Sequence, residues 1–534
     1  MTEERPAGPP EETRPPTEPT ASPSPAEPAQ PAPESATAAP TEPAAPTEPT
    51  APAAPTETAA PAAPPPARPA RRLAVRRLLA LGGRLGVALL AAVGAVALAA
   101  GVILVPGPSI QATPPAIDVV PDRGDQLLVC PGPVLGLSTG AGAQVAAVAS
   151  PERLVAGSGL VEGGIPTSDA LEGGAATVTL PVTAPDSRVA AAERTAVATD
   201  DVSGLAASEC AAPQPTSWLV GGDTTTGRTT WIVLSNPGAV AATVALELWG
   251  AAGPVEAPGT SGIVVAPGSQ RVLPLAGFAP GEPSPVVGVT SRGGSVTATL
   301  QQTIVRGLQP AGAAIVTGAP APGRDLVIPA LPVIAPAAVA EAAADDGSLD
   351  YAPTLRLLVP GEDPAEVEVR LTPAGGGDAV VVRAEVDAGR VLDLALTERV
   401  TEGEYAVAID SDVPVVAGAR VGAPAGAGLD LAWISAAPRL DADDGEIIAA
   451  VAPGSGALLH LAAGEDPVVV TVDGRDLEIP ARGAITVPVA GSSAPRLSTT
   501  GPLHAAVSYR GDAGLGLSRV LAPAGAPRPL TIYP

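Results

Sequence analysis

Residues 355–373 read LRLLVPGEDPAEVEVRLTP, which is two short apolar runs joined by the turn sequence PGEDP. Polar and apolar residues alternate through AEVEVRL, the pattern of a strand that buries one face and exposes the other. Further runs follow as VRAEVDAGRVLDLAL at 382–396 and YAVAIDSDVPVVAGARV at 405–421, separated by turn-forming residues. This segment therefore predicts short antiparallel strands joined by tight turns.

The same order of runs and turns recurs on both sides of this segment. Upstream the runs are WIVLSNPG (231–238), TVALELWG (243–250), IVVAPGSQRVLPL (263–275) and VVGVTSRGGSVTATLQQT (286–303); downstream they are LLHLAAGEDP (458–467), VVVTVDG (468–474), LEIPARGAITVPV (477–489) and LSTTGPLHAAVSYRG (497–511). Units of roughly 100 residues built from such strands are typical of Ig-like and fibronectin-like β-sandwiches. We expect a mainly β chain of tandem sandwich repeats, with a β-propeller as the alternative packing.

The pattern divides this part of the chain into one irregular β-unit and three clearer ones. The predicted boundaries are 118–215 for the first unit and 216–350, 351–440 and 441–534 for the three repeats, after a Pro-rich stalk at 106–117. A short Ala-rich piece at 335–344 is the one segment here with helical character.

Two cysteines, Cys130 and Cys210, lie in the first β-unit. They lack the CxxC spacing and the further ligands of a metal site. We expect them to form one disulfide, which would require an oxidising, extracytoplasmic compartment. Two buried free thiols are the alternative.

Residues 85–105, LGVALLAAVGAVALAAGVILV, form a run of 21 residues without a charge. As a helix this run is about 30 Å long, the thickness of the hydrocarbon core of a bilayer. Six arginines come just before it, namely Arg68, Arg71, Arg72, Arg76, Arg77 and Arg84. By the positive-inside rule they keep the N-terminus in the cytoplasm and place the large C-terminal region outside the plasma membrane. The alternative, a cleaved signal peptide starting near Val75, fits less well because the apolar run is too long and no A-x-A site follows.

Residues 1–70 contain 22 prolines among Ala, Glu and Thr. Proline has no amide donor and a fixed φ, so neither a helix nor a sheet propagates through such a segment. We expect a disordered cytoplasmic tail, followed by a basic juxtamembrane segment at 71–84.

The net charge of −25 lies almost wholly beyond the apolar run, where 22 Arg stand against 45 acidic residues. A surface this acidic repels phosphate backbones, so we expect no binding to nucleic acid.

We find no catalytic or metal-binding constellation in the sequence, and we expect no metal and no cofactor. His460 and His504 are the only histidines and fall within predicted strands, where half-buried structural roles are expected. The acidic loops DADDGE (441–446) and DDGSLD (345–350) offer oxygen ligands for Ca²⁺ but do not fit the EF-hand spacing.

Exposed tryptophans can form a stacking platform for carbohydrate, and the chain has four tryptophans. They are Trp218, Trp231, Trp249 and Trp433. Trp231 and Trp249 fall at in-strand positions and are expected to anchor the core, while Trp218 is less clear.

A family resemblance rests on CPGP (130–133), a second Cys before WLVGG (218–222), and the later GRTTWIVLSNPG, APGS and AGAAIVTGAPAP. These motifs resemble an actinobacterial family of membrane-anchored proteins that is catalogued as a domain of unknown function. The resemblance covers about 118–534 and implies a single-pass envelope protein with a large extracytoplasmic part. It brings no catalytic residues with it.

We expect a non-enzymatic envelope protein whose outer part is a scaffold or a binding module for envelope proteins or glycans. One alternative is an accessory subunit or enzyme of envelope polysaccharide assembly. Another is a transmembrane coupler whose Pro-rich tail recruits a cytoplasmic partner. A deep pocket lined by carboxylates favours the enzyme, and flat sandwich faces favour the scaffold. The sequence makes no prediction of oligomeric state.

Overall fold

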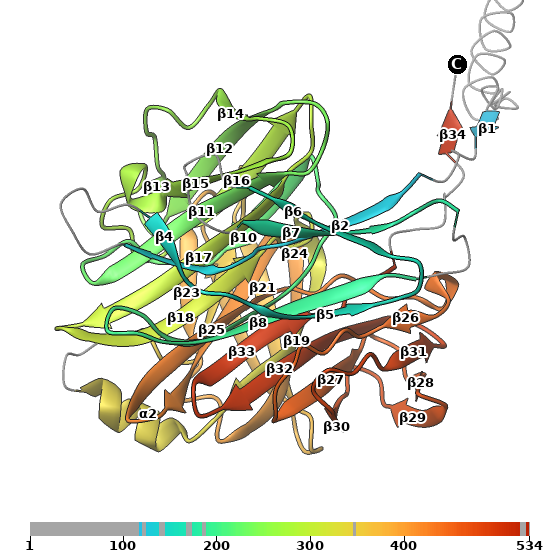
Figure 1. The fold of residues 1–534 in the computed structure, drawn as a ribbon. Coiled ribbons are helices and arrows are strands. Elements are labelled where there is room, and N and C mark those ends of the chain that lie inside the picture. The colour runs from blue at the N-terminus through green and yellow to red at the C-terminus, as the bar shows by residue number, and fades with distance from the viewer. Residues whose placement is uncertain are drawn as a thin grey trace, which may run out of the picture. The chain divides into compact units, whose positions relative to one another are not determined.

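Strands dominate the computed structural model of the chain (Figure 1), which confirms the mainly β prediction. The structure describes residues 117–119, 124–137, 145–166, 174–183, 188–344, 349–523 and 530–532. The predicted tail, the six membrane-flanking arginines and the apolar run at 85–105 lie outside these residues. Across the described ranges, no helix is long and apolar enough to cross a membrane.

The first strand group follows the short strand β1 (Ile117–Val119), which pairs with the last strand of the chain, β34 (Leu530–Ile532). Its sheets have the orders β2-β7-β6, β3-β4 and β5-β8-β9. The strands are β2 (Gln126–Cys130), β3 (Val134–Leu137), β4 (Val145–Ala149), β5 (Glu152–Ala156), β6 (Val161–Ile165), β7 (Ala175–Leu180), β8 (Ala190–Ala198) and β9 (Ser203–Glu209).

The second strand group is two sheets that share one apolar core. Their orders are β10-β16-β12-β13, with β14 also on β12, and β15-β11-β17-β18. The elements are β10 (Thr216–Val220), β11 (Arg228–Asn236), β12 (Ala242–Gly250), β13 (Gly253–Pro254), β14 (Ile263–Val265), β15 (Ser269–Pro274), the 3-10 turn η1 (Leu275–Gly277), β16 (Val286–Arg292), β17 (Thr297–Arg306) and β18 (Gln309–Thr317).

The third strand group is organised by β24, a strand of 23 residues. Its first half pairs with β19 and β21, and its second half pairs with β20 and β25. The elements are β19 (Gly323–Val333), α2 (Pro336–Ala343), β20 (Thr354–Leu358), β21 (Ala365–Pro373), β22 (Val380–Val386), β23 (Val391–Ala395), β24 (Gly403–Ala425) and β25 (Gly428–Ser435). The helix α2 lies within the Ala-rich piece that the sequence indicated.

The predicted alternation at 355–373 holds in β21, where Val367, Val369 and Leu371 are buried and Glu366 is exposed. The run before the turn behaves differently, because all five residues of β20 are buried. The two strands do not pair with each other; each pairs with one half of β24.

The fourth strand group again has two sheets around one core, with the orders β26-β31-β28-β29 and β30-β27-β32-β33. The elements are η3 (Ala442–Asp444), β26 (Ile447–Ile448), β27 (Ala457–Ala463), β28 (Val468–Val472), β29 (Arg475–Ile479), β30 (Ala484–Val489), β31 (Arg496–Thr499), β32 (Leu503–Gly511) and β33 (Gly514–Arg519).

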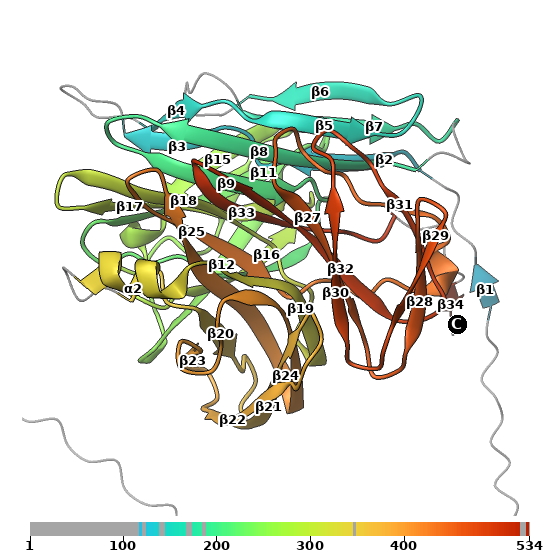
Figure 2. The same cartoon turned by 90° about the horizontal axis from the view of Figure 1, so that it is seen from below.

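Four strands, one from each group, meet in the interior; we call β9, β18, β25 and β33 the inner strands. Each is the last strand of its group and lies at the edge of its sheet. β9 and β25 each contact both β18 and β33, which closes a ring of contacts through the middle of the four groups (Figure 2). The groups are therefore joined to one another along a shared axis.

One buried carboxylate joins the inner strands. Asp430 of β25 accepts hydrogen bonds from the backbone N–H groups of Leu205 in β9 (2.9 Å), Ala313 in β18 (3.0 Å) and Leu515 in β33 (3.1 Å). Burial raises the pKa of Asp430 to about 7, against the lowering effect of these backbone donors. We call this arrangement the Asp430 hub.

Three glycines make room for that side chain. Gly204, Gly312 and Gly514 immediately precede the three residues that donate to Asp430, and their φ values are +143°, +138° and +123°. A Cβ atom at Gly204 would lie 2.5 Å from Asp430 Oδ1, and one at Gly514 would overlap the same carboxylate. Glycine is therefore needed both for its backbone conformation and for the space it leaves.

An ion pair joins two of the same strands, four residues beyond Leu205 and Leu515. Arg519 of β33 donates to Glu209 of β9 (Nε to Oε1, 3.0 Å) and to the carbonyls of Ala436 (3.0 Å) and Gly318 (2.6 Å). Burial is the largest effect and raises the pKa of Glu209, but the attraction of Arg519 and the hydrogen bonds from Arg519 and Thr317 together outweigh it and hold this pKa below its usual value. Two sets of contacts therefore connect all four groups: the Asp430 hub and the contacts of Arg519.

Candidate functional site

The predicted disulfide is confirmed. Cys130, the last residue of β2, is bonded to Cys210, which follows β9, across 80 residues of sequence. Both residues are buried, with Leu128, Val178 and Leu180 in the same apolar cluster. The bond connects the sheet of β2 to the inner strand of the first group.

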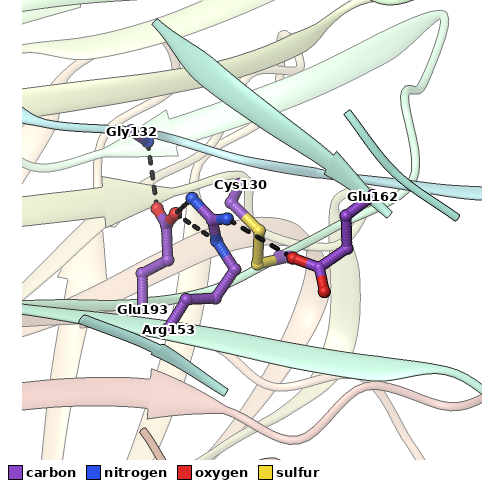
Figure 3. Close-up of a disulfide and its surroundings, with 6 residues drawn as sticks. Cys130, Gly132, Arg153, Glu162 and Glu193 are labelled. Carbon is purple, nitrogen blue, oxygen red and sulfur yellow. Dashed lines mark hydrogen bonds and ion pairs between the residues drawn. A yellow bond between two sulfur atoms is a disulfide. The ribbon is translucent and has the colours of Figure 1, made fainter. Parts of the chain in front are cut away.

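A buried carboxylate lies beside the disulfide (Figure 3). Glu193 of β8 accepts hydrogen bonds from the backbone N–H of Gly132 (3.0 Å) and from Nε of Arg153 (2.7 Å). Burial raises the pKa of Glu193, and attraction to Arg153 opposes this effect. Because both carboxylate oxygens are already bonded within the protein, this cluster has a structural role.

The two histidines lie in strands, as predicted, but they are buried more deeply than expected. His460 is 1% exposed, and its Nε2 lies 2.9 Å from Oγ of Ser508, which is also buried. Glu404 lies 3.9 Å from that same nitrogen, whereas a Ser-His-Asp site needs the carboxylate on Nδ1. Burial lowers the pKa of His460 to about 3, so this histidine stays neutral inside the sheet.

The tryptophans pack between sheets instead of forming a stacking platform. Trp218 and Trp249 contact each other with ring centroids 5.3 Å apart. They pack on a cluster that includes Val286 from the second group and Leu358 from the third. Trp231 is buried, as predicted for a core anchor.

The acidic loop at 441–446 is stabilised from within the protein. Asp441 and Asp444 form a capping box around η3, and Arg439 donates to Asp441. In the other acidic loop, residues 345–348 lie outside the described residues, and Asp350 pairs with Arg228. Within the part of the chain that the structure describes, no group of three or more His, Cys, Asp or Glu side chains could hold a metal ion.

A polar pocket of about 440 Å³ lies between the second and third strand groups. Its charged lining residues are Asp223, Arg228, Asp350, Asp393 and Arg420. Hydroxyl groups of Thr225, Ser284, Thr354 and Thr397 complete its polar lining. We call this the polar pocket; the loop before β11, the loop before β16, and strands β20, β23 and β24 position its residues.

Arg356 of β20 fixes one wall of the polar pocket, although its own side chain is fully buried. It donates to both oxygens of Asp393, at 2.8 Å each, and to the carbonyls of Gly222 (2.9 Å) and Pro285 (3.1 Å) in the second group. Burial is the largest effect and raises the pKa of Asp393, but the attraction of Arg356 and the hydrogen bonds from Arg356 and Ser284 together outweigh it, so the net pKa is lowered. Arg356 therefore holds Asp393 ionised and binds the two groups together.

The opposite wall comes from the second group. Arg228 donates from Nε to Oδ2 of Asp350 (3.1 Å), and Asp223 accepts from the N–H (2.7 Å) and Oγ1 (2.6 Å) of Thr225. Burial raises the pKa of Asp223 despite these two hydrogen bonds, and the charge of Asp350 adds to the rise. The pocket thus holds carboxylates with opposite pKa shifts.

Arg420 is the pocket residue whose bonding capacity is least used. The residue is 5% exposed; it donates to the carbonyl of Leu349 (2.8 Å) and lies over the ring of Trp433, 5.4 Å from its centre. Arg356 lies 4.8 Å from the same ring centre. The Nε atom of Arg420 is buried and has no hydrogen-bond partner among the described residues. Burial and the neighbouring Arg356 both lower the pKa of Arg420.

A family of unknown function (DUF5719) matches residues 167–500. The chain belongs to this family. No curated protein matches the chain. Among solved structures, the crystal structure of Thermotoga maritima 1070 is similar at 18% identity, over 22% of this chain and 93% of that one, with a TM-score of 0.18.

The DUF5719 segment contains the whole polar pocket and the Asp430 hub residue itself. It does not contain Cys130 or Arg519, so the disulfide and the axial ion pair extend beyond the matched residues. The family description assigns no activity, and the chemistry of this DUF5719 chain must be argued from the pocket.

Charge and hydrogen bonding define what the polar pocket of this DUF5719 chain can bind. The lining has three carboxylates and two guanidinium groups, and the buried Arg356 behind Asp393 adds a third positive charge. The carboxylates repel anions, and the guanidinium groups repel cations. Convergent donors and acceptors on both sides suit a neutral ligand with many hydroxyl groups, which donate and accept at once.

No local pattern indicates this pocket, because its residues lie between positions 223 and 420 and meet only after two groups have packed together. Asp350 of the pocket belongs to the acidic loop at 345–350 and pairs with Arg228 of the second group. Trp433 is not a lining residue, but its ring lies under the guanidinium group of Arg420.

Proposed function

We propose that the protein is a membrane-anchored envelope protein whose outer part binds carbohydrate in the polar pocket. In this proposal residues 1–70 are a disordered cytoplasmic tail, residues 85–105 are a single transmembrane helix, and the strand groups are tandem sandwich repeats outside the plasma membrane. The observation that carries the proposal is the buried Arg420, whose Nε lacks a partner among the described residues, in a pocket lined by charged groups of both signs.

The location is supported by the apolar run with its arginine-rich flank and by the disulfide. Its test is protease treatment of intact cells that carry tags at both ends of the full chain. The C-terminal tag should be digested and the N-terminal tag protected. The reverse pattern would overturn the proposed orientation.

Carbohydrate fits the pocket better than the other ligand classes. Paired carboxylate and guanidinium groups bind hydroxyl groups with directional, charge-assisted hydrogen bonds. A phosphate or carboxylate ligand would approach Asp223 and Asp393, and a cation would approach Arg228 and Arg420. Water could fill the pocket in the absence of ligand, and the ligand's hydroxyls would replace those bonds.

Binding is tested with the full chain in lipid nanodiscs on an array of glycans, including envelope polysaccharide fragments. The blocking variant is Ala395→Trp, because Ala395 is exposed on β23 and lines the polar pocket. The matched control is Val381→Trp, an exposed strand position of the same sheet that is not among the pocket's lining residues. Loss of glycan binding in the first variant alone supports the proposal; equal binding by both variants would overturn it.

A second candidate function is favoured by the carboxylates themselves, since a pocket of this kind was the feature expected of an envelope-polymer enzyme. Asp223 has a raised pKa and Asp393 a lowered one, as in the acid and base pair of a glycosidase. Against this assignment, both oxygens of Asp393 are bonded to Arg356, and Ser284 also donates to Oδ2 at 2.7 Å. A carboxylate so fully engaged is poorly placed to attack a sugar.

Turnover separates the two candidates. An enzyme should release reducing sugar from a bound glycan, and Asp223→Asn should abolish that release while glycan binding persists. A binding module should retain the glycan unchanged over prolonged incubation, in the wild type and in the variant alike.

A further inference from the structure

We infer that the ligand of the polar pocket is amphipathic, with an apolar tail that enters a second pocket under α2; this inference rests on the proposed carbohydrate binding. The second pocket has a volume of about 270 Å³ and is lined by Val333, Ile334, Val339, Tyr351 and Pro353, among other residues. We call it the apolar pocket.

The two pockets adjoin each other. Leu349, Ala352 and Thr397 line both of them. A ligand in the polar pocket therefore lies next to the apolar pocket, with these three residues at the border. Pockets of about 440 and 270 Å³ that adjoin one another match the size of a small-molecule site, roughly 300–1,000 Å³.

The lining of the apolar pocket offers little to a polar group. The hydroxyl of Tyr351 is engaged in a 2.6 Å hydrogen bond with the carbonyl of Ala311, and the residue is fully buried. Among the described lining residues, Thr397, at the border with the polar pocket, has the one other polar side chain. A polar extension of the carbohydrate would lose its hydrogen bonds here, whereas an alkyl chain would gain by leaving water.

The helix contributes one of its faces to the pocket. Pro336, Val339, Ala340 and Ala343 line the pocket, and their spacing places them on the same side of α2. Three of these side chains are small, which leaves room beside the helix. Ala338 lies on another side of α2 and is not part of the lining.

An exposed leucine marks the junction of the pockets. Leu349 is 73% exposed, although it directly precedes the buried Asp350 and Tyr351. Large apolar side chains exposed singly are common, but this one borders both pockets at once. It is placed to cover an alkyl chain that passes from one pocket to the other.

The test uses the full chain in lipid nanodiscs and isothermal titration with methyl, butyl and hexyl glycosides of glucose, galactose, mannose and N-acetylglucosamine. Empty nanodiscs give the background. For the sugar that binds, affinity should rise roughly fourfold for each added methylene group until the apolar pocket is full.

Two variants assign that rise to the apolar pocket. Ala340→Trp fills the pocket from an exposed helical position, and Ala338→Trp is its matched control on another side of the helix. The first should bind the hexyl glycoside no better than the methyl glycoside, and the control should behave as the wild type. Leu349→Ser changes an exposed position that tolerates substitution. It should reduce the rise in affinity from the methyl to the hexyl glycoside and leave the affinity for the methyl glycoside unchanged.

The outcomes separate this inference from the proposed function. Binding of methyl glycosides without a gain from the tail overturns the inference and leaves carbohydrate binding standing. A gain from the tail that persists in Ala340→Trp also overturns it. Equal binding of hexanol and hexyl glycosides overturns the proposed function, because the sugar would then contribute nothing. Failure of every glycoside to bind overturns both.

Discussion

Replacing Asp430 with alanine removes the acceptor that joins the four inner strands. The N–H groups of Leu205, Ala313 and Leu515 then remain buried without their partner. Each buried, unpaired N–H costs about 1–3 kcal/mol, so the free energy of unfolding should fall by about 3–9 kcal/mol. We expect a value near the lower end, because water entering the cavity left by the side chain can bond some of these donors. The loss is still a large part of the total stability of a protein, which is about 5–15 kcal/mol.

Asparagine at the same position should cost less. Its carbonyl oxygen can replace Oδ2, which accepts from Leu205 and Leu515, while its amide group would face the N–H of Ala313. One donor is then unpaired instead of three, and the expected loss is about 1–3 kcal/mol. The free energy of unfolding should therefore decrease in the order wild type, Asp430→Asn, Asp430→Ala, because each change leaves more N–H donors unpaired.

Urea unfolding of the full chain in nanodiscs measures these differences. All four tryptophans lie between positions 218 and 433, so their fluorescence reports on the β strands and not on the N-terminal region. The control is Asp363→Ala, at an exposed position in the turn between β20 and β21. If Asp430→Ala unfolds at the same urea concentration as Asp363→Ala, the Asp430 hub does not hold the groups together and the reasoning is refuted.

Three further predictions concern the same buried groups. The pKa of Asp430 in the folded protein, about 7, is higher than its ordinary value of 3.8, so the stability that its protonation provides is complete below about pH 4 and is lost as the pH rises through 7. At 1.36 kcal/mol per pKa unit, the free energy of unfolding of the wild type relative to Asp430→Asn should fall by about 4 kcal/mol between pH 4 and pH 8; a constant difference would contradict the assigned shift. Glu209→Gln leaves Arg519 buried without its counter-charge and should cost about 3–5 kcal/mol in the same urea assay, whereas Glu446→Gln, which alters an exposed ion pair with Arg496, should cost less than about 1 kcal/mol. Replacing Cys130 and Cys210 with serine opens a loop spanning 80 residues and should lower stability by roughly 4 kcal/mol, and reducing agent should then no longer affect the unfolding midpoint.

The strands were predictable from local patterns, because each depends on a few neighbouring residues. AEVEVRLTP alternates and becomes β21, and the Ala-rich piece becomes α2. The pairing partners were less predictable. The strands β20 and β21 adjoin in sequence, yet they pair with opposite halves of β24, since a strand of 23 residues can serve two sets of neighbours.

Asp430 illustrates why the contact between the four inner strands was not predicted from the sequence. In GLDLAWIS it alternates with Leu429, Leu431 and Trp433, so the pattern places it on a solvent-facing side. An inner strand, however, is enclosed on both faces, and seven of the eight residues of β25 are buried. The other inner strands contain glycine and alanine, whose small side chains leave space where the four strands meet. This feature can be interpreted only once the four strands are known to be in contact.

The axis and the polar pocket are physically coupled through Trp433. This residue lies on β25, three positions beyond Asp430. Its ring contacts the guanidinium groups of Arg356 and Arg420, which lie at the polar pocket. Its Nε1 donates to Gln302 of the second group (2.7 Å), so it also joins the two groups whose residues line the pocket. Because the pocket exists only while these groups remain packed together, a ligand that binds it must stabilise their packing. At a concentration of one hundred times its Kd, such a ligand should add about 2.7 kcal/mol to the free energy of unfolding and offset much of the loss in Asp430→Asn. A glycan that binds with unchanged affinity but raises the stability of neither protein would show that the pocket forms without the contact between the groups, and the coupling argued here would be wrong.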